Sequence, residues 1–589
     1  MAENMRRLGG SVLLLLGCLA VAFLSMPPRA AAFELNVGES LHLSPSEPPQ
    51  QESVFGSFLA GMIAERRGDY GAAADFLIHA LSADPDNPGL LMQAFMLNAA
   101  EGRIQSAYAL AERLQELERS DVASLLLLAA QALEGEDPQQ AREFLDRQPP
   151  SGLVEITRPV LDAWLAVADG KGEEALAALD ELEEEPGLLA LLTLHRVLML
   201  DVMGRQDDAV EVAQGFLEGN ESLSLRLVWH LGNLLERAGE EERAEELYSS
   251  FQERNPDNRF LAEELALGRE GERPVTVPDA RRGFAEALFD FASLMAQEQA
   301  PIPALIHARL ALHLAPELHT ARVLIGEILQ YQSRREAAIE IYESVPADSP
   351  LAWSAGLRIA EELERLERYE EAAERLRQLS DQRPERYEPL YRLGNLLRMQ
   401  EKFEEAAVVY SEALEVAGEP RRQHWILYYF RAVAYERSDQ WERAEPDFKQ
   451  ALELEADQPY VLNYLAYSWI EQKRNFDKAE EMLLRAVERE PEDGHIIDSL
   501  GWLYYRLGDY DNAVVQLERA VELQPQDPVI NDHLGDAYWR LDRRREAVIQ
   551  WRRALSLDPD EDEVPLIERK LDEGLPGPSS STAPPEEQI

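Results

Sequence analysis

The chain has 589 residues, of which 45% are hydrophobic, and its 58 basic and 110 acidic residues give a formal net charge of −52. A negative field of this size repels nucleic acid and anionic lipid surfaces, which argues against both as main partners. The one cysteine, Cys18, lies close to the N-terminus. The rest of the chain therefore has no disulfide, no thiolate metal site and no catalytic cysteine.

Residues 1–32 have the layout of a bacterial signal peptide. Arg6 and Arg7 precede an apolar run at 12–24, and small residues follow at 30–32. A positive start, a short apolar core and a small-residue cleavage site are the parts of a secretory signal. The run is also too short to span a bilayer comfortably. The sequence therefore predicts cleavage after Ala32 and export to the periplasm.

An alternative interpretation of the same residues is a lipoprotein signal. Leu15-Leu16-Gly17-Cys18 has the form of a lipobox, although apolar residues continue beyond the cysteine as far as Leu24. In that case Cys18 would carry lipid and the protein would be an outer-membrane lipoprotein, the only form in which we expect membrane contact. Residues 33–53, rich in Pro, Ser and Glu, are expected to be a flexible spacer.

Most of the chain is built from a repeated pattern of helical spacing. Its clearest copies are related by a shift of 34 residues, which carries Leu500, Gly501, Tyr504, Ala513, Ala520 and Pro525 onto Leu534, Gly535, Tyr538, Ala547, Ala554 and Pro559. Within each copy two apolar runs of helical period are separated by a short turn, which predicts a helix–turn–helix hairpin whose small residues let the helices approach closely.

One alanine marks the register of this pattern along the chain. It recurs at or close to a 34-residue interval at Ala73, Ala107, Ala141, Ala175, Ala209 and Ala244. After a gap of 60 residues the series resumes at Ala304, Ala338, Ala372, Ala406, Ala444, Ala479, Ala513 and Ala547. Six hairpins are predicted over 54–258 and eight over 285–561. Glycines and prolines interrupt the rhythm at 259–284, which predicts either a hinge or a surface loop. A capping helix is expected at 562–575 and a disordered tail at 576–589.

The repeat length and its small residues resemble the tetratricopeptide repeat. The resemblance covers about residues 54–561 and implies an all-α, superhelical solenoid of about fourteen hairpins that binds other proteins or peptides on its inner face. The hairpins' first helices would bury their fourth, seventh, eighth and eleventh positions. Their second, fifth, ninth and twelfth positions would then line the concave face.

The predicted concave face carries our candidate partner-binding residues. They are aromatic, carboxylate and amide side chains: Tyr391, Asn395, Tyr464, Asp498, Trp502, Tyr505, Asp532, Asp536 and Trp539. Such side chains on a surface that the hairpin core does not need suggest a peptide-binding groove. The alternative is that Trp502 and Trp539 pack against the neighbouring repeat. A carboxylate clamp is not expected, because Tyr391 stands where that clamp needs a lysine.

No catalytic motif is present. The chain has no phosphate-binding loop, dinucleotide fingerprint, zinc-protease motif or nucleophile elbow. His307, His313 and His319 are six residues apart and would point to different faces of a helix, which argues against a metal site. We therefore expect no enzyme activity, no cofactor and no metal.

The last three repeats carry a narrower resemblance. Asn463-Tyr464-Leu465-Ala466-Tyr467, Asp498-Ser499-Leu500-Gly501-Trp502 and the block at 531–539 are similar to the C-terminal repeats of exported tetratricopeptide-repeat adaptors of Gram-negative bacteria. That group includes a lipoprotein that delivers substrates to a periplasmic C-terminal processing protease. The resemblance implies an envelope scaffold or adaptor, possible partners being such a protease and its substrates. The alternative is a structural subunit of an envelope assembly or secretion complex.

Overall fold

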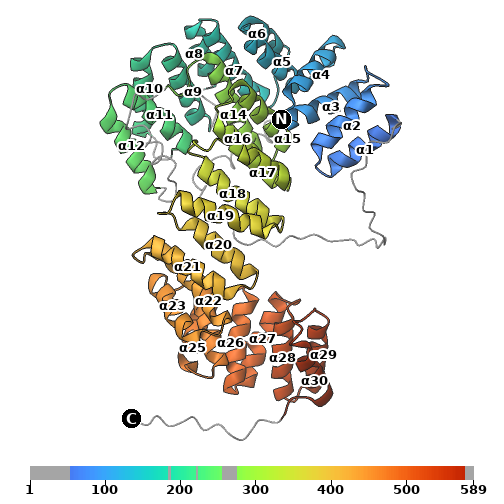
Figure 1. Cartoon of the computed structure of the whole chain (residues 1–589), viewed down its shortest axis with the longest axis vertical. Coiled ribbons are helices and arrows are strands. Elements are labelled where there is room, and N and C mark those ends of the chain that lie inside the picture. Colours follow the sequence, from blue (N-terminus) through green and yellow to red (C-terminus); the bar gives the residue numbers. More distant parts are fainter. Residues whose placement is uncertain (1–53, 183–186, 220–222, 255–274, 577–589) are drawn as a thin grey trace, which may run out of the picture. The chain divides into compact units, whose positions relative to one another are not determined.

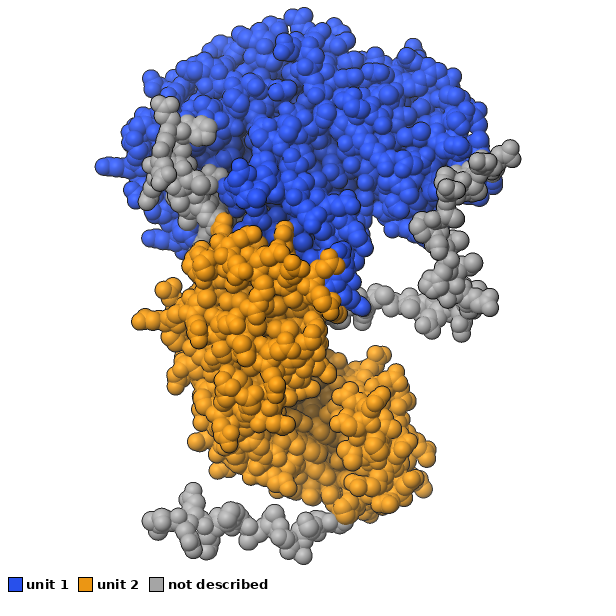
Figure 2. All heavy atoms as spheres, viewed as in Figure 1, with its two compact units in different colours: residues 1–368 blue, residues 369–589 orange. Residues whose placement is uncertain are grey.

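The computed structural model describes residues 54–182, 187–219, 223–254 and 275–576 (Figure 1). The predicted signal peptide, the spacer, most of the predicted break at 259–284 and nearly all of the predicted tail lie outside these residues. Every regular element within the described ranges is helical. The chain divides into two compact units, residues 1–368 and 369–589, which Figure 2 colours separately.

In unit 1, successive helices pair into antiparallel hairpins. The helices of this unit are α1 (Val54–Arg66), α2 (Tyr70–Leu81), α3 (Pro88–Glu101), α4 (Ile104–Glu116), α5 (Val122–Glu134), α6 (Pro138–Asp146), α7 (Val154–Ala168), α8 (Gly172–Asp180), α9 (Leu189–Val202), α10 (Gln206–Gly219), α11 (Leu225–Arg237), α12 (Glu241–Arg254), α14 (Ala280–Gln297), α15 (Pro301–Leu314), α16 (His319–Tyr331), α17 (Arg335–Glu343) and α18 (Ala352–Arg365).

Unit 2 continues the same pattern and ends with a single helix. Its helices are α19 (Tyr369–Gln382), α20 (Glu388–Met399), α21 (Phe403–Ala417), the short 3-10 helix η3 (Arg422–His424), α22 (Trp425–Arg437), α23 (Trp441–Leu454), α24 (Pro459–Glu471), α25 (Phe476–Arg489), α26 (Gly494–Leu507), α27 (Tyr510–Leu523), α28 (Pro528–Arg540), α29 (Arg544–Leu555) and α30 (Val564–Glu573).

The register alanines lie where the two helices of each hairpin meet. Ala244 is 1% exposed, and the other thirteen are completely buried. Glycines on the first helices allow the same close approach. A Cβ added to Gly326 would lie 2.3 Å from the Tyr342 ring, and one added to Gly394 would lie 2.5 Å from the Tyr410 ring. The pattern of small residues therefore specifies the hairpins, and the predicted all-α solenoid of hairpins is confirmed.

Unit 1 also contains contacts between hairpins that are far apart in the sequence. Helix α14 packs against α7 and α9, and α15 packs against α3 and α5. At one such contact Gly283 of α14 lies against the Trp164 ring of α7, where an added Cβ would be 2.2 Å from the ring. The hairpin formed by α14 and α15 therefore covers part of the face that the preceding first helices turn away from their own second helices.

At the end of unit 2, α30 packs against α29. Ile567 of α30 is 2% exposed and joins the apolar core of the last hairpins. In the part of the chain that the structure describes, no helix combines the length and the apolar character needed to cross a membrane. Within the same residues, no group of histidines and carboxylates is arranged to hold a metal ion.

Candidate protein-binding surfaces

Trp502 of α26 is half-buried between aromatic rings from two hairpins. Its ring stacks on Tyr505, with 4.7 Å between centroids, and on His533 of α28, with 4.0 Å between centroids. Its Nε1 donates to Glu471 of α24 at 2.7 Å. The side chain therefore contacts the repeats on both sides. Tyr505 also accepts a hydrogen bond from Arg540 Nε at 3.2 Å.

Asp498 is 5% exposed and forms an ion pair within the protein. Nδ1 of His533 lies 3.0 Å from both carboxylate oxygens of Asp498, so that α28 is bound to α26. Burial by itself would lower the pKa of His533, but the Asp498 carboxylate more than offsets this effect and raises it. The carboxylate is thus already engaged by the next repeat.

Helix α30 covers Asp532, Asp536 and Trp539 of α28. Lys570 of α30 pairs with both carboxylates, and Trp539 Nε1 donates to the Leu575 carbonyl at 3.2 Å. Asp536 also accepts a hydrogen bond at 2.9 Å from Nε1 of the buried Trp551. Burial is the main cause that raises the pKa of Asp536, to about 6. The chain itself therefore occupies this end of the predicted surface.

The remaining predicted residues also contact neighbours. Asn395 accepts a hydrogen bond from the Tyr410 hydroxyl at 2.7 Å. The Tyr464 hydroxyl donates to Glu436 at 3.0 Å, and its ring stacks on Phe448. Tyr391 is half-buried beside Phe430, with 6.2 Å between ring centroids. The nine candidates thus line the first helices of unit 2, and their use in binding a partner stays a prediction.

Unit 1 has an open apolar groove that our sequence analysis missed. It consists of two joined cavities of about 470 and 390 Å³. The cavities share four lining residues, Phe289, Ser293, Thr320 and Leu351. The larger cavity is further lined by residues of α14 and α16, and the smaller by residues of α9 and α11. We call the pair of cavities the unit 1 groove.

The unit 1 groove lies on the face of the hairpins that the repeat pattern assigns to partners. On α16 it is lined by Thr320, Val323 and Glu327, which are three and four residues apart. These are the second, fifth and ninth positions of their repeat, equivalent to His495, Asp498 and Trp502 in the later repeat. Applying the same rule to every repeat would therefore have selected these three residues as inner-face positions.

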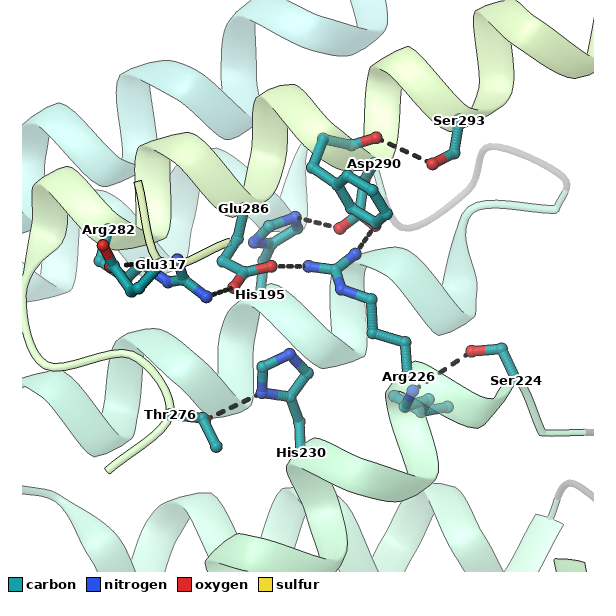
Figure 3. A network of polar contacts seen from close by, with 12 residues as sticks. His195, Ser224, Arg226, His230, Thr276, Arg282, Glu286, Asp290, Ser293 and Glu317 are labelled. Atoms are coloured by element: carbon teal, nitrogen blue, oxygen red, sulfur yellow. Dashed lines mark hydrogen bonds and ion pairs between the residues drawn. The ribbon is translucent and has the colours of Figure 1, made fainter. Parts of the chain in front are cut away.

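The wall of the smaller cavity contains buried ion pairs. The Arg226 guanidinium of α11 lies between the carboxylates of Glu286 and Asp290 on α14 and pairs with both (Figure 3). Arg282 pairs with Glu286 at 2.8 Å and with Glu317 at 3.1 Å. Burial opposes ionisation of Glu286, but Arg226 and its other cationic neighbours lower its pKa to about 2. This network binds α14 to α11.

Two buried histidines complete the network. Trp164 Nε1 donates to Nδ1 of His195 at 3.1 Å, so the proton of the neutral ring is on Nε2, which lies 3.1 Å from Asp290 (Figure 3). Nδ1 of His230 is 2.9 Å from the Thr276 hydroxyl. Burial lowers the pKa of both rings to about 3, so both are neutral near pH 7.

The chemistry of the groove suits binding. The ionic groups in its wall offset one another, and most of the remaining lining is aliphatic or aromatic. Among the described residues, the buried Thr320 Oγ1 has no hydrogen-bond partner. A surface of this kind accepts apolar side chains and offers a few polar groups that fix their orientation.

Family models identify the repeats. Models of the tetratricopeptide repeat match residues 357–424 and 530–561, and a model described as TPR repeat matches residues 501–542. These parts of the chain are tetratricopeptide repeats. Repeats of this type generally form non-catalytic scaffolds that bind other proteins or peptides.

Two curated relatives match short segments of these repeats. The TPR repeat-containing protein PA4667 of Pseudomonas aeruginosa is 32% identical over 82 residues, which is 14% of either chain. The UDP-N-acetylglucosamine–peptide N-acetylglucosaminyltransferase of Giardia intestinalis is 37% identical over 83 residues, 14% of this chain and 5% of the transferase. The matches span far less than two thirds of either relative, so the transferase's activity is not assigned to this chain.

Solved structures with related folds have low overall similarity. The Cut9–Hcn1 complex of the APC/C matches 88% of this chain and 96% of its own, with 16% identity and a TM-score of 0.36. Yeast Tom70 matches 88% and 95%, with 14% identity and a TM-score of 0.29. YrrB, a TPR protein with an unusual peptide-binding site, matches 33% and 99%, with 21% identity and a TM-score of 0.27.

Proposed function

We propose that this protein is a non-catalytic scaffold or adaptor that binds segments of partner proteins along the inner face of its TPR hairpins. The unit 1 groove is the observation that carries the proposal. It is formed by successive first helices, remains open after the hairpins have packed, and is lined mainly by apolar side chains. Burying such surface contributes about 25 cal/mol per Å², so apolar side chains inserted into the groove would stabilise a complex.

We further propose that the scaffold works in the bacterial cell envelope. Support comes from the N-terminal sequence, where Arg6 and Arg7, the apolar run at 12–24 and the small residues at 30–32 have the layout of an export signal. A periplasmic location follows from cleavage after Ala32, and an outer-membrane lipoprotein follows from lipidation of Cys18.

Delivery of substrates to a periplasmic C-terminal processing protease is the most specific form of this function. It rests on the likeness of the last three repeats to exported adaptors. A structural subunit of an envelope assembly is the second candidate, and such a subunit would use its outer surface and its ends. The adaptor and the structural subunit can be distinguished by experiment, because only the adaptor needs an accessible inner face.

Quantitative affinity purification of the exported protein from cell envelopes tests the proposal. We expect Val323→Glu, which places a carboxylate in the groove, to lose partners that the wild type retains. Ile78→Glu is the matched control, because Ile78 is 41% exposed on α2 and does not line the groove. Equal recovery of partners by both variants, with both folded, would contradict binding in the groove.

A further inference from the structure

Helix α29 lies at the C-terminal end of unit 2 (Figure 1). Several of its arginines are exposed. Its buried side, which packs on α28, carries Ala547, Trp551 and Ala554. At 3.6 residues per turn the opposite side carries Arg545, Ile549, Arg552 and Arg553. All four side chains are exposed, and Ile549 is 61% exposed. We call these four residues the arginine face.

The arginine face differs from its basic neighbours in being unpaired. Arg543 pairs with Glu518 and Glu546, and Arg544 pairs with Asp542. Within the described ranges, no ion pair engages the three arginines of the face. The chain as a whole has a net charge of −52, so three unpaired cations on two turns of one helix form a positively charged patch on a negatively charged protein.

Stabilisation of the helix explains only part of this arrangement. Arg552 and Arg553 lie in the last turn, where the helix dipole favours cations. Arg545 lies in the first turn, where the same dipole disfavours a cation. The helix dipole therefore does not account for the position of Arg545.

The preceding hairpin has the opposite charge at two of the three equivalent positions. One repeat earlier, α27 carries Asp511 and Glu518 where α29 carries Arg545 and Arg552. The apolar residue between them is retained, since Val515 is equivalent to Ile549 and is 60% exposed. The pattern of the repeat thus produces an exposed apolar residue with charges around it. Helix α29 reverses the sign at two of these positions, and at the third Arg553 corresponds to Arg519, which is also basic.

We propose that the arginine face binds a short acidic segment of another protein, with carboxylates on either side of an apolar side chain. The carboxylates would pair with Arg545, Arg552 and Arg553, and the apolar side chain would cover Ile549. Arginine beside an exposed apolar residue is typical of protein interfaces. This surface lies on a second helix, so the inference is independent of the inner-face binding proposed above.

The overall charge favours a short peptide segment over a polyanion. Nucleic acid or an anionic membrane would bring many negative charges close to a chain of −52, and the repulsion would oppose binding. A segment with a few carboxylates meets much less repulsion. Phosphates alone would also leave Ile549 exposed.

Fluorescence anisotropy with the full chain tests this inference. The probe is a synthetic acidic peptide with glutamates on both sides of a single leucine. The variants are Arg545→Gln/Arg552→Gln/Arg553→Gln, and Ile549→Ser, which keeps the charge. The matched control is Lys402→Gln/Lys473→Gln/Lys478→Gln, which removes three exposed cations elsewhere in unit 2. Circular dichroism checks that each variant retains its helices.

We expect the triple arginine variant to bind the peptide about tenfold more weakly or worse, and the lysine control to bind as the wild type does. Ile549→Ser should weaken binding by a smaller factor, and replacing the leucine of the peptide by serine should have a similar effect. Equal binding by the arginine variant and the wild type would overturn the inference. Tighter binding of single-stranded DNA or of anionic vesicles than of the peptide would also overturn it.

Discussion

Arg334 and Glu101 are 233 residues apart in the sequence, and Nη2 of Arg334 donates a hydrogen bond to Oε1 of Glu101 at 2.5 Å. Arg334 precedes α17, and Glu101 is the last residue of α3. The same guanidinium lies over the ring of Tyr70, 4.6 Å from its centroid. Unit 1 is therefore held together by contacts between distant hairpins as well as by those between neighbours.

The Arg334–Glu101 pair should contribute measurable coupling energy. Both side chains are largely buried, with 11% and 16% of their surface exposed. We expect a double-mutant cycle with Arg334→Gln and Glu101→Gln to give about 1.5–3 kcal/mol, the range for a hydrogen bond between charged groups. Denaturant unfolding of the four proteins measures it. Additive effects of the two substitutions would show that the contact does not stabilise unit 1.

Replacing Gly283 by alanine should destabilise unit 1. The new methyl group would lie 2.2 Å from the ring of Trp164, which is fully buried and cannot move aside. We expect a cost of about 1–3 kcal/mol in the free energy of unfolding. Gly215→Ala in α10 is the control, because no atom lies near its added Cβ. Alanine at position 215 should increase the free energy of unfolding by about 0.5–1 kcal/mol. A change in the same direction for both variants would contradict the close packing of Gly283 on Trp164.

Acid should weaken unit 1 through His195 and His230. Burial holds the pKa of both rings at about 3 in the folded state, against about 6.5 when unfolded. The unfolded state therefore binds more protons between these values, and stability should fall as the pH drops from about 6.5 toward 3. Hydrogen exchange of α9 and α11 measures the effect. His230→Gln should make the decline shallower, and an unchanged slope would contradict this assignment.

His533 in unit 2 should respond in the opposite direction. Its pairing with Asp498 raises its folded pKa, against the opposing effect of burial. The contribution of this pair is complete below about pH 6.5 and is lost as the pH rises through the folded value. Exchange protection of α26 and α28 relative to a His533→Gln variant should therefore be greater at pH 5.5 than at pH 8. The reverse order would show that the pair does not stabilise the hairpin contact.

Trp502 should contribute to stability even if it also binds a partner. Its ring lies against His533, and its Nε1 donates to Glu471. Removing both contacts in Trp502→Ala should cost about 1–3 kcal/mol in the unfolding of unit 2. Trp502→Phe keeps an aromatic ring at this position and should lower the stability of unit 2 by less. An unchanged unfolding midpoint in the alanine variant would favour a purely external role for the side chain.

The hairpins could be predicted from the sequence because their determinants are local and periodic. Each register alanine lies where the second helix of its own hairpin meets the first. The contact of Asp498 with His533 was also within reach, because the two residues are 35 apart, one residue more than the length of the repeat. The contacts between distant hairpins of unit 1 could not be predicted, since Arg334 and Glu101 meet at a separation that no repeat period specifies.

The unit 1 groove could not be predicted from the sequence for a different reason. The positions of Thr320, Val323 and Glu327 follow the rule that selected Tyr391 and Trp502, but the rule gives only the face on which a side chain lies. Whether such a side chain is covered depends on the packing of α9, α11, α14 and α16 together. Only the structure shows that a cavity remains between them.

Site-specific photo-crosslinking in living cells tests the central claim, that partner proteins bind on the inner face of the hairpins. A photoreactive phenylalanine replaces Val323 in the groove or, as the control, the exposed Glu340 on α17. We predict crosslinks to a discrete partner from position 323 and none to that partner from position 340. Crosslinks to the same partner from position 340 alone, or none from either position, would contradict the account.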